Sequence, residues 1–324
     1  MDTLHLDLIG GRIRVTGDSP RIREGVLGAV PLLACAPFDA PPDLAYDFRT
    51  LAPGESIPDF STYRSEAGSA AQDFEFLRKG SERWVVVGGR SAARFALDEG
   101  SVRVSVHRDH LEDPWTIGHR LFFLPLLEWM RCRGLYPLHG SSFLAGGRGV
   151  VVCGPSGVGK STATLAAIAA GCPFAADDTL FAMRKGETIV LRPFPEPVKV
   201  GAETARFFPE LRDRLRSIGP KYLLSEEALP PPGRVSEVVP DVLLFPEIAD
   251  RERSRFDPLT GEEAMVRLLP QSVLPSDRDQ VEAHIEILAD LVRQAPAYRL
   301  RFGRDPRDLP SRIAGLAPGT SRIA

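Results

Sequence analysis

The sequence has few cysteines and no long apolar run, and both shortages limit the class of protein. Its 324 residues include four cysteines, none in a CxxC pair or beside a histidine at zinc spacing, so we expect no disulfide framework and no structural zinc site. The longest apolar stretch, LFFLPLLEWM, is broken by Pro125 and Glu128 and is far shorter than the roughly 18 residues of a membrane span. The first residues, MDTLHLDLIG, carry acids where a secretory signal needs basic residues. These features predict a reduced, cytoplasmic protein without a membrane partner.

The chain also lacks an excess of charge of either sign. Its 40 basic and 43 acidic side chains leave a net charge of −3, which predicts no nucleic-acid partner. Lysine is scarce among the 40 basic residues, and the five lysines are Lys79, Lys160, Lys185, Lys199 and Lys221. A lysine inside a recognisable motif is therefore informative. The composition, with 43% hydrophobic and 26% charged residues, is that of a globular protein, and the length suggests about two domains.

The pattern along the chain predicts a β-rich first domain over residues 1–112. Short segments alternate apolar and polar residues, as strands with one buried face do; they lie at 4–16, around Gly10-Gly11, at 84–89, in ARFAL and at 101–108. We expect these strands to pair antiparallel. Residues 52–72 have no period and many turn formers, which predicts a loop. Residues 113–134 have an acidic start, a basic end and a following glycine, which predicts a helix. The domain boundary is placed near residue 112.

Residues 113–324 predict an α/β domain, because strand patterns alternate with helical ones. LHGSSFLAGGRGVVVCG reads as two strands joined by a tight turn at Gly146-Gly147. A helix is expected from Lys160 to about residue 170, followed by a strand in PFAADDTLFAM. Further strands are expected in TIVLRPF, VVPDVLLFP and YRLRFGRD, and helices in EEAMVRLL and DRDQVEAHIEILADLVRQA.

One motif in this second domain predicts nucleotide binding. Residues 154–161 read GPSGVGKS and match GxxxxGK[ST] directly after a predicted strand and before a predicted helix. Glycines in such a loop let backbone N–H groups point inward around phosphate oxygens, and the helix adds its positive N-terminal end. The lysine reaches the β- and γ-phosphates, and the serine hydroxyl faces Mg²⁺. The predicted ATP-binding residues are Gly154, Pro155, Ser156, Gly157, Val158, Gly159, Lys160, Ser161 and Thr162.

Two adjacent acids, Asp177 and Asp178, follow at the end of the next predicted strand. Strand side chains alternate between faces, so both carboxylates cannot be core residues. We predict that Asp177 faces the phosphate site and takes a proton from an acceptor hydroxyl, and that Asp178 holds Mg²⁺ together with Ser161. Nucleoside and sugar kinases also carry an acid on this strand, so the pair alone does not select a family.

His139, in LYPLHGSS, adds a further element to the pattern. The order of a His-Gly strand, a hairpin, GPSGVGKS, a short helix and a strand ending in ADD resembles the catalytic domain of HPr kinase/phosphorylase. That family shares its P-loop core with phosphoenolpyruvate carboxykinases. The resemblance covers about residues 134–183 clearly. It implies a P-loop kinase core, with Asp177 as the acid/base, Asp178 as its metal-side neighbour and His139 as an active-site histidine.

The sequence departs from the family after this segment. The bifunctional members have a glycine-rich, RGLGI-like run there, whereas this chain has RPFPEPVKVG. The sequence is therefore more similar to the diverged HPr-kinase-related proteins, some of which phosphorylate serine hydroxyls of other peptides. Glu196 is a candidate substitute metal ligand, and Lys199 and Lys221 are candidate contacts for phosphate or substrate.

Three functions stay open on the sequence alone. The first is an ATP- and Mg²⁺-dependent kinase that acts on a serine of a protein or peptide, with the β-rich domain recognising the substrate or mediating assembly, including a homo-oligomer. The second is a small-molecule kinase for a nucleoside, sugar or metabolite. The third is a nucleotide-binding regulator with little catalysis.

Overall fold

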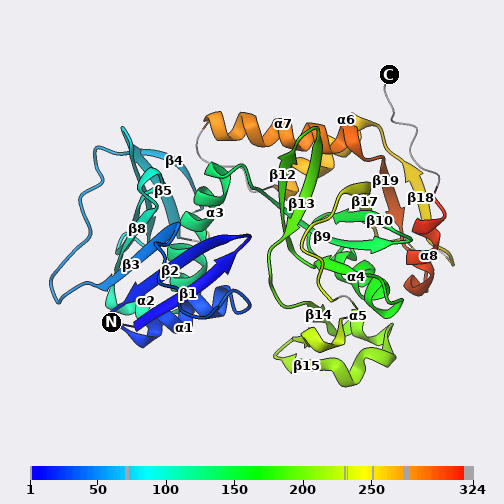
Figure 1. Ribbon diagram of the computed structural model, residues 1–324, viewed down its shortest axis with the longest axis horizontal. Helices are drawn as coiled ribbons and strands as arrows, with labels where there is room; N and C mark the ends of the chain where they lie inside the picture. Colours follow the sequence, from blue (N-terminus) through cyan, green and yellow to red (C-terminus); the bar gives the residue numbers. More distant parts are fainter. Residues whose placement is uncertain are drawn as a thin grey trace. The chain divides into compact units, whose positions relative to one another are not determined.

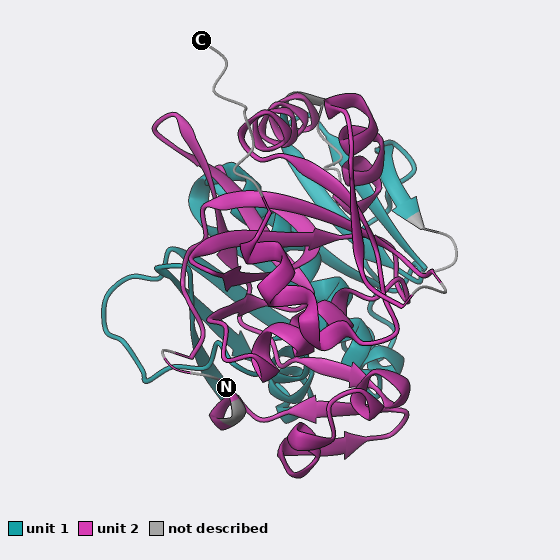
Figure 2. Cartoon of the chain, turned by 90° about the vertical axis from the view of Figure 1, so that its right-hand side faces the viewer, with its two compact units in different colours: residues 1–133, 275–280 teal, residues 134–274, 281–324 magenta. Residues whose placement is uncertain are grey.

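The polypeptide is a mixed α/β protein with two large mixed sheets, one in each of two compact units. The structure, a computed structural model, describes residues 2–69, 73–229, 231, 233–249, 252–272 and 278–316. Unit 1 comprises Met1–Arg133 and Pro275–Gln280, and unit 2 comprises Gly134–Leu274 and Val281–Ala324 (Figure 2). Among the described residues, no helix is both long enough and apolar enough to cross a membrane.

Unit 1 is built on an eight-stranded sheet in the order β1-β2-β3-β8-β7-β6-β5-β4 (Figure 1). Its strands are β1 (Asp2–Leu8), β2 (Gly11–Gly17), β3 (Leu44–Thr50), β4 (Arg64–Ser69), β5 (Phe74–Lys79), β6 (Glu82–Val87), β7 (Ser91–Ala96) and β8 (Ser101–Val106). The alternation of buried and exposed residues that predicted strands at 4–16 recurs in β1 and β2, which pair antiparallel across a turn at Ile9-Gly10.

Two expectations for unit 1 were wrong. The sheet is not wholly antiparallel, because β3 pairs parallel with both β2 and β8. The helix α1 (Pro20–Ala29) lies between β2 and β3 in the chain, and such a crossover lets the next strand run parallel. The predicted loop 52–72 contains the strand β4, which pairs with β5 although its sequence, RSEAGS, is polar and carries little strand signal. Residues 70–72 of that loop lie outside the described residues.

The predicted helix at 113–134 is present as a π-helical segment, η3 (Thr116–Phe122), that continues into α3 (Phe123–Cys132). The short helix α2 (Arg108–Leu111) precedes it. The segment belongs to unit 1, because η3 packs closely on α1, where a side chain on Gly118 would lie 2.2 Å from the Gly25 carbonyl oxygen. The compact units thus divide after Arg133, while the domain boundary near residue 112 stays a prediction.

The main sheet of unit 2 has the order β13-β12-β9-β10-β17-β19-β18, and β11 also pairs with β9. Its strands are β9 (Tyr136–Ala145), β10 (Arg148–Cys153), β11 (Phe174–Ala176), β12 (Thr179–Lys185), β13 (Thr188–Pro193), β17 (Pro240–Glu247), β18 (Arg255–Pro258) and β19 (Ala297–Arg301). The hairpin of β9 and β10 turns at Gly146-Gly147, as predicted. The strands β10, β17 and β19 run parallel.

Helices cover both faces of this sheet. They are α4 (Lys160–Ala169), α6 (Gly261–Leu268), α7 (Arg278–Gln294) and α8 (Leu309–Ala314). Val150 and Val152 of β10 face a core that contains residues of α4 and α8, whereas Val151 faces a core that contains residues of α6 and α7. Burial on both faces explains the uninterrupted apolar run of β10. A separate small sheet holds β14 (Lys199–Gly201), β16 (Lys221–Leu224) and β15 (Leu215–Ile218), with α5 (Ala202–Arg206) after β14.

Candidate active site

The GPSGVGKS motif forms the loop between β10 and α4, as its sequence predicted. Gly157 has φ +87° and Gly159 has φ +112°, a backbone conformation that residues with side chains rarely adopt. A side chain at Gly159 would also lie 2.5 Å from the Phe302 ring. Gly159 is the N-cap of α4 and has no side chain to bind the first amides of the helix. Those amides are therefore available to a phosphate.

Lys160 is held against the loop that precedes it. Its side chain is buried, and Nζ donates hydrogen bonds to the carbonyl oxygens of Gly154 at 2.7 Å and Pro155 at 3.0 Å. Burial lowers the pKa of the Lys160 ammonium, and the negative charge of Asp178 partly offsets this effect. Within the described residues, the lysine is thus a buried cation whose hydrogen bonds go to two carbonyl oxygens of the phosphate-binding loop.

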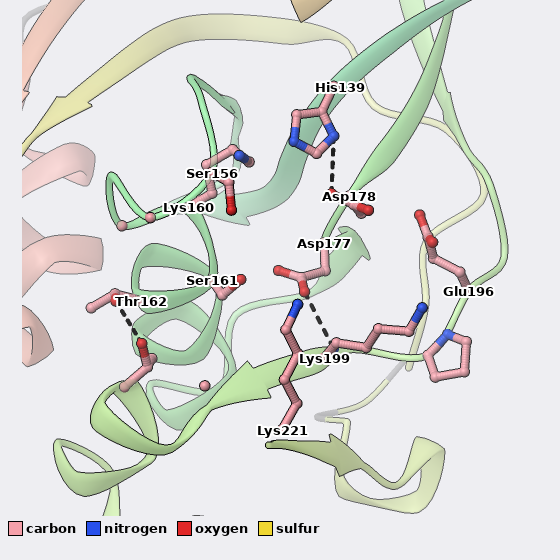
Figure 3. A pocket seen from close by; sticks show the side chains of 15 residues that line it. His139, Ser156, Lys160, Ser161, Thr162, Asp177, Asp178, Glu196, Lys199 and Lys221 are labelled. Carbon is pink, nitrogen blue, oxygen red and sulfur yellow. Dashed lines mark hydrogen bonds and ion pairs between the residues drawn. The ribbon is translucent and has the colours of Figure 1, made fainter. Parts of the chain in front are cut away.

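The two predicted acids lie where a strand is interrupted. The segment PFAADDTLFAM was predicted as one strand, but it forms β11 and β12, which both pair with β9 and are separated by Asp177 and Asp178. The Asp178 carbonyl accepts a hydrogen bond from the Gly140 amide at 2.9 Å, which keeps the break next to β9. Because the strand is broken, its side chains need not alternate there, and both carboxylates line the same cavity (Figure 3).

The two carboxylates have different environments. Asp177 is 5% exposed, and its Oδ1 has no hydrogen-bond partner within the described residues. Burial, reinforced by the nearby charge of Asp178, raises the pKa of Asp177 to about 6. Asp178 is more exposed, and its Oδ1 lies 2.9 Å from Nδ1 of His139. Burial opposes ionisation of Asp178, but the contact with His139 and the positive charge of Lys160 outweigh it and lower its pKa. Asp177 therefore binds a proton more readily than an ordinary aspartate, whereas Asp178 stays ionised.

The cavity has a volume of about 400 Å³ and collects most of the predicted site residues (Figure 3). The predicted residues that line it are His139, Ser156, Gly157, Gly159, Lys160, Ser161, Thr162, Asp177, Asp178, Glu196, Lys199 and Lys221. Gly154, Pro155 and Val158 do not line it and face a second cavity instead. His139 contacts Asp178 and not Asp177. Leu138 is fully buried while His139 reaches the cavity, because neighbouring side chains of a strand point to opposite faces.

Three parts of the site were not predicted from the sequence. Thr204 of α5 lines the cavity, and its hydroxyl lies 3.3 Å from that of Thr162. The Lys199 amide donates to Asp177 Oδ2 at 3.4 Å, so β14 is a neighbour of the buried acid. Arg234 binds the backbone of both acid-bearing segments, donating to the carbonyls of Ala175 and Glu196 at 2.9 Å each. No local pattern marks a threonine or arginine so distant in the sequence as a neighbour of this loop.

Glu196 is the third carboxylate of the cavity, and it lies on the segment between β13 and β14. Its Oε1 is buried without a hydrogen-bond partner in the described part of the chain. Burial and the charge of Asp178 raise its pKa to about 7. A carboxylate oxygen with no protein partner, facing two other acids, is a position that a cation would stabilise.

The oxygen donors of the cavity fit Mg²⁺ brought by a nucleotide. Within the described residues, no group of three or more His, Cys, Asp or Glu side chains could hold a metal ion by itself. Mg²⁺ usually binds through one or two carboxylates, hydroxyls and the phosphates of the substrate, and keeps several waters. Ser161 and Asp178 supply a hydroxyl and an ionised carboxylate in the same cavity as the phosphate-binding loop. This donor set suits a metal that arrives with its phosphates.

Comparison with known proteins gives likenesses to solved structures only. No family model matches the sequence, and no curated protein matches it. Among solved structures, the HPr(Ser) kinase/phosphatase from Coxiella burnetii is similar, with a TM-score of 0.32 and 12% sequence identity. The match covers 56% of this chain and 92% of that one.

Proposed function

We propose that this protein is an ATP- and Mg²⁺-dependent kinase that transfers the γ-phosphoryl group of ATP to a hydroxyl of a protein or peptide. The observation that carries the proposal is that the loop lysine, Lys160, and the two unequal acids, Asp177 and Asp178, line one cavity. A nucleotide-binding loop alone occurs in many functions. A buried carboxyl beside it, with a pKa of about 6, adds the base that phosphoryl transfer to an alcohol requires.

In this proposal the loop and α4 bind the phosphates. The amides of the first turn of α4 and of the loop donate to phosphate oxygens, and Lys160 exchanges its two carbonyl partners for the β- and γ-phosphates. Ser161 and Asp178 are the residues that would hold Mg²⁺, with Glu196 as a further oxygen donor. When bound, Mg²⁺ would neutralise the negative charge that develops on the phosphate oxygens.

Asp177 acts as the general base. Its carboxylate accepts the proton of the acceptor hydroxyl while the hydroxyl oxygen forms a bond to the γ-phosphorus and the bond from that phosphorus to the ADP oxygen breaks. ADP leaves, and Asp177 is left protonated. A pKa raised to about 6 makes this carboxylate a better base than an exposed aspartate, yet leaves most of it ionised at neutral pH. Lys199 and Lys221 line the outer part of the cavity and would contact the acceptor.

A labelled-phosphate experiment tests the proposal and separates the three functions. The protein is incubated with [γ-³²P]ATP, Mg²⁺ and a lysate divided by dialysis into large and small molecules. We expect label in the large fraction, on serine after acid hydrolysis. Label confined to the dialysable fraction would indicate a small-molecule kinase, and no acceptor-dependent label in either fraction would indicate a regulator.

Matched variants show whether the transfer uses the proposed site. Asp177→Asn should reduce the rate of labelling by roughly 10²–10⁴-fold, whereas Asp213→Asn, at an exposed position of unit 2, should not change it. Asp178→Asn should transfer label only at a higher Mg²⁺ concentration, because it removes a proposed metal ligand. Transfer that is indifferent to Asp177 would mean that another protein or another site is responsible.

A further inference from the structure

A second cavity, of about 410 Å³, lies beside the phosphate-binding loop. The loop itself contributes Gly154, Pro155 and Val158 to its wall, and the end of β17 contributes Phe245 and Pro246. We propose that this cavity binds the adenine base and ribose of the nucleotide, with Gln271 as the residue that recognises the base. The inference rests on the proposed function, since it concerns the other end of the same ATP molecule.

The first argument is the direction in which a bound triphosphate must run. Transfer requires the γ-phosphate to face Asp177 and Asp178, which line the first cavity, on the side of the loop where β9, β11 and β12 lie. The nucleoside must then leave the loop away from the acids. The second cavity lies toward β17, the neighbour of β10 on the side opposite β9. Ligands of parallel sheets bind beyond the carboxyl ends of the strands, and this cavity lies at those ends of β10 and β17.

The second argument is the chemistry of the two walls. The first cavity is lined mainly by charged and hydroxyl side chains, which suits phosphates and a cation. The second is lined by three prolines, Val158 and the ring of Phe245, with few polar groups between them. A volume of this size, mostly apolar with a few polar side chains, is typical of a site that encloses a flat organic group.

The polar groups of the second cavity can identify adenine. Gln271 is only 8% exposed and ends the 3-10 turn Leu269–Gln271. The bridge from the next residue, Ser272, to Leu138 fixes the end of that turn against β9. A glutamine amide can donate to N7 and accept from the N6 amino group of adenine at the same time, whereas guanine presents two acceptors, N7 and O6, at that edge. Arg267, which pairs with Glu247 at 3.9 Å, supplies a planar cation that can cover a base.

Calorimetric titration of the full-length protein with ATP, GTP and inorganic tripolyphosphate, each with Mg²⁺, tests this inference. Tripolyphosphate probes the phosphate loop alone, so it separates the inference from the proposed function. We expect wild-type protein to bind ATP more tightly than GTP. The variant Gln271→Leu should weaken ATP binding about tenfold and leave tripolyphosphate binding unchanged. Gln271→Trp, which fills the cavity, should weaken ATP further with the same lack of effect on tripolyphosphate.

The matched control is Val266→Ala, an exposed position on α6 beside Arg267, which should bind all three ligands like the wild type. The inference is overturned if both Gln271 variants bind ATP normally, if they weaken ATP and tripolyphosphate equally, or if GTP binds as tightly as ATP. If wild-type protein still binds tripolyphosphate in those cases, the proposed phosphate site stands although the proposed adenine site does not. Failure of wild-type protein to bind either ATP or tripolyphosphate would contradict the proposed function itself.

Discussion

At the scale of single residues, the site depends on charges that are buried to different degrees. Lys160 and Asp177 are nearly inaccessible, while Asp178 and His139 are partly exposed and pair with each other. The sequence alone identified these four residues, because the loop motif and the adjacent acids are local patterns. It could not predict which acid is buried, since that depends on how the strand breaks between β11 and β12.

The role of the loop lysine is tested by Lys160→Ala. No other ammonium in the loop can reach the β- and γ-phosphates, so we expect ATP affinity to fall by at least about tenfold and phosphate transfer to be lost. Lys185→Ala is the matched control, because that lysine is exposed and pairs with Glu237. Titration calorimetry with ATP and Mg²⁺ measures the effect. Unchanged ATP affinity and turnover in Lys160→Ala would show that this loop does not bind the phosphates of ATP.

The raised pKa values of Asp177 and Glu196 link stability to pH. Their values of about 6 and about 7 exceed the ordinary 3.8 and 4.5, so the folded protein keeps protons that the unfolded chain releases. The stability they contribute is complete below the ordinary values and is lost as pH rises through about 6 and 7. Asp177→Asn cannot ionise and should therefore raise the free energy of unfolding of the nucleotide-free protein by about 2 kcal/mol at pH 8, with little change at pH 4.

Denaturant unfolding at pH 4 and pH 8 measures the free energy of unfolding of each protein. Glu196→Gln should also raise this free energy at pH 8 more than at pH 4. Asp213→Asn, at an exposed position, serves as the control. An equal effect of Asp177→Asn at pH 4 and pH 8, or a loss of stability at pH 8, would show that folding does not raise the pKa of this carboxyl.

His139 is expected to act on the reaction through Asp178. Because its contact lowers the pKa of Asp178, His139→Ala should raise the Mg²⁺ requirement, reduce turnover by at least about tenfold and alter the acid limb of the pH–rate profile, while ATP still binds. His139→Gln can keep a hydrogen bond to Asp178 and should recover part of the turnover. A folded His139→Ala variant with wild-type turnover and profile would make the histidine structural.

At the scale of elements, the position of the acids depends on Arg234. Its guanidinium bridges the backbone of β11, through Ala175, to the backbone of Glu196, and also pairs with Glu226 at 2.7 Å. It lies over the ring of Phe174, 4.8 Å from the centroid. A planar guanidinium can make all these contacts at once, and a lysine cannot. Arg234 thus fixes both segments that carry the buried carboxylates.

We expect Arg234→Ala to lower the free energy of unfolding by about 2 kcal/mol, because it leaves buried carbonyls without donors. Turnover should fall and the acid limb of the pH–rate profile should shift, while the affinity for ATP stays near wild type because the loop is untouched. Arg234→Lys should recover stability better than turnover. The exposed Arg307→Ala is the control. A stable Arg234→Ala variant with normal turnover would exclude this positioning role.

The elements that could be predicted are those whose signal is local. The hairpin of β9 and β10, the loop and α4 follow from alternation, glycines and a helical period, and the structure confirms them. The small sheet of β14, β15 and β16 has only short strands, so its pattern is too brief to identify. This sheet contributes Lys199 and Lys221 to the cavity. The sequence predicted these two lysines as contacts for phosphate or substrate, but it did not predict the sheet that carries them.

At the scale of the whole molecule, composition and alternation predicted a β-rich first part and an α/β second part, and each unit has a large sheet of that kind. The order of strands in unit 1 could not be predicted, because β3 is inserted between β2 and β8 by pairings distant in sequence. The same is true of Arg234 and Thr204, which reach the site through tertiary contacts. The proposed site residues can therefore be predicted from local sequence motifs, whereas the strand order and tertiary contacts that position them cannot.

The measurement that tests the account most directly is the rate of acceptor-dependent transfer of the γ-phosphoryl group by wild-type protein and by Asp177→Asn, made with both proteins saturated with ATP and Mg²⁺. The account predicts equal ATP affinity and a rate lower by roughly 10²–10⁴-fold in the variant, the usual contribution of a general base. Equal rates in the two proteins, or no acceptor-dependent transfer by wild-type protein that binds ATP, would contradict it.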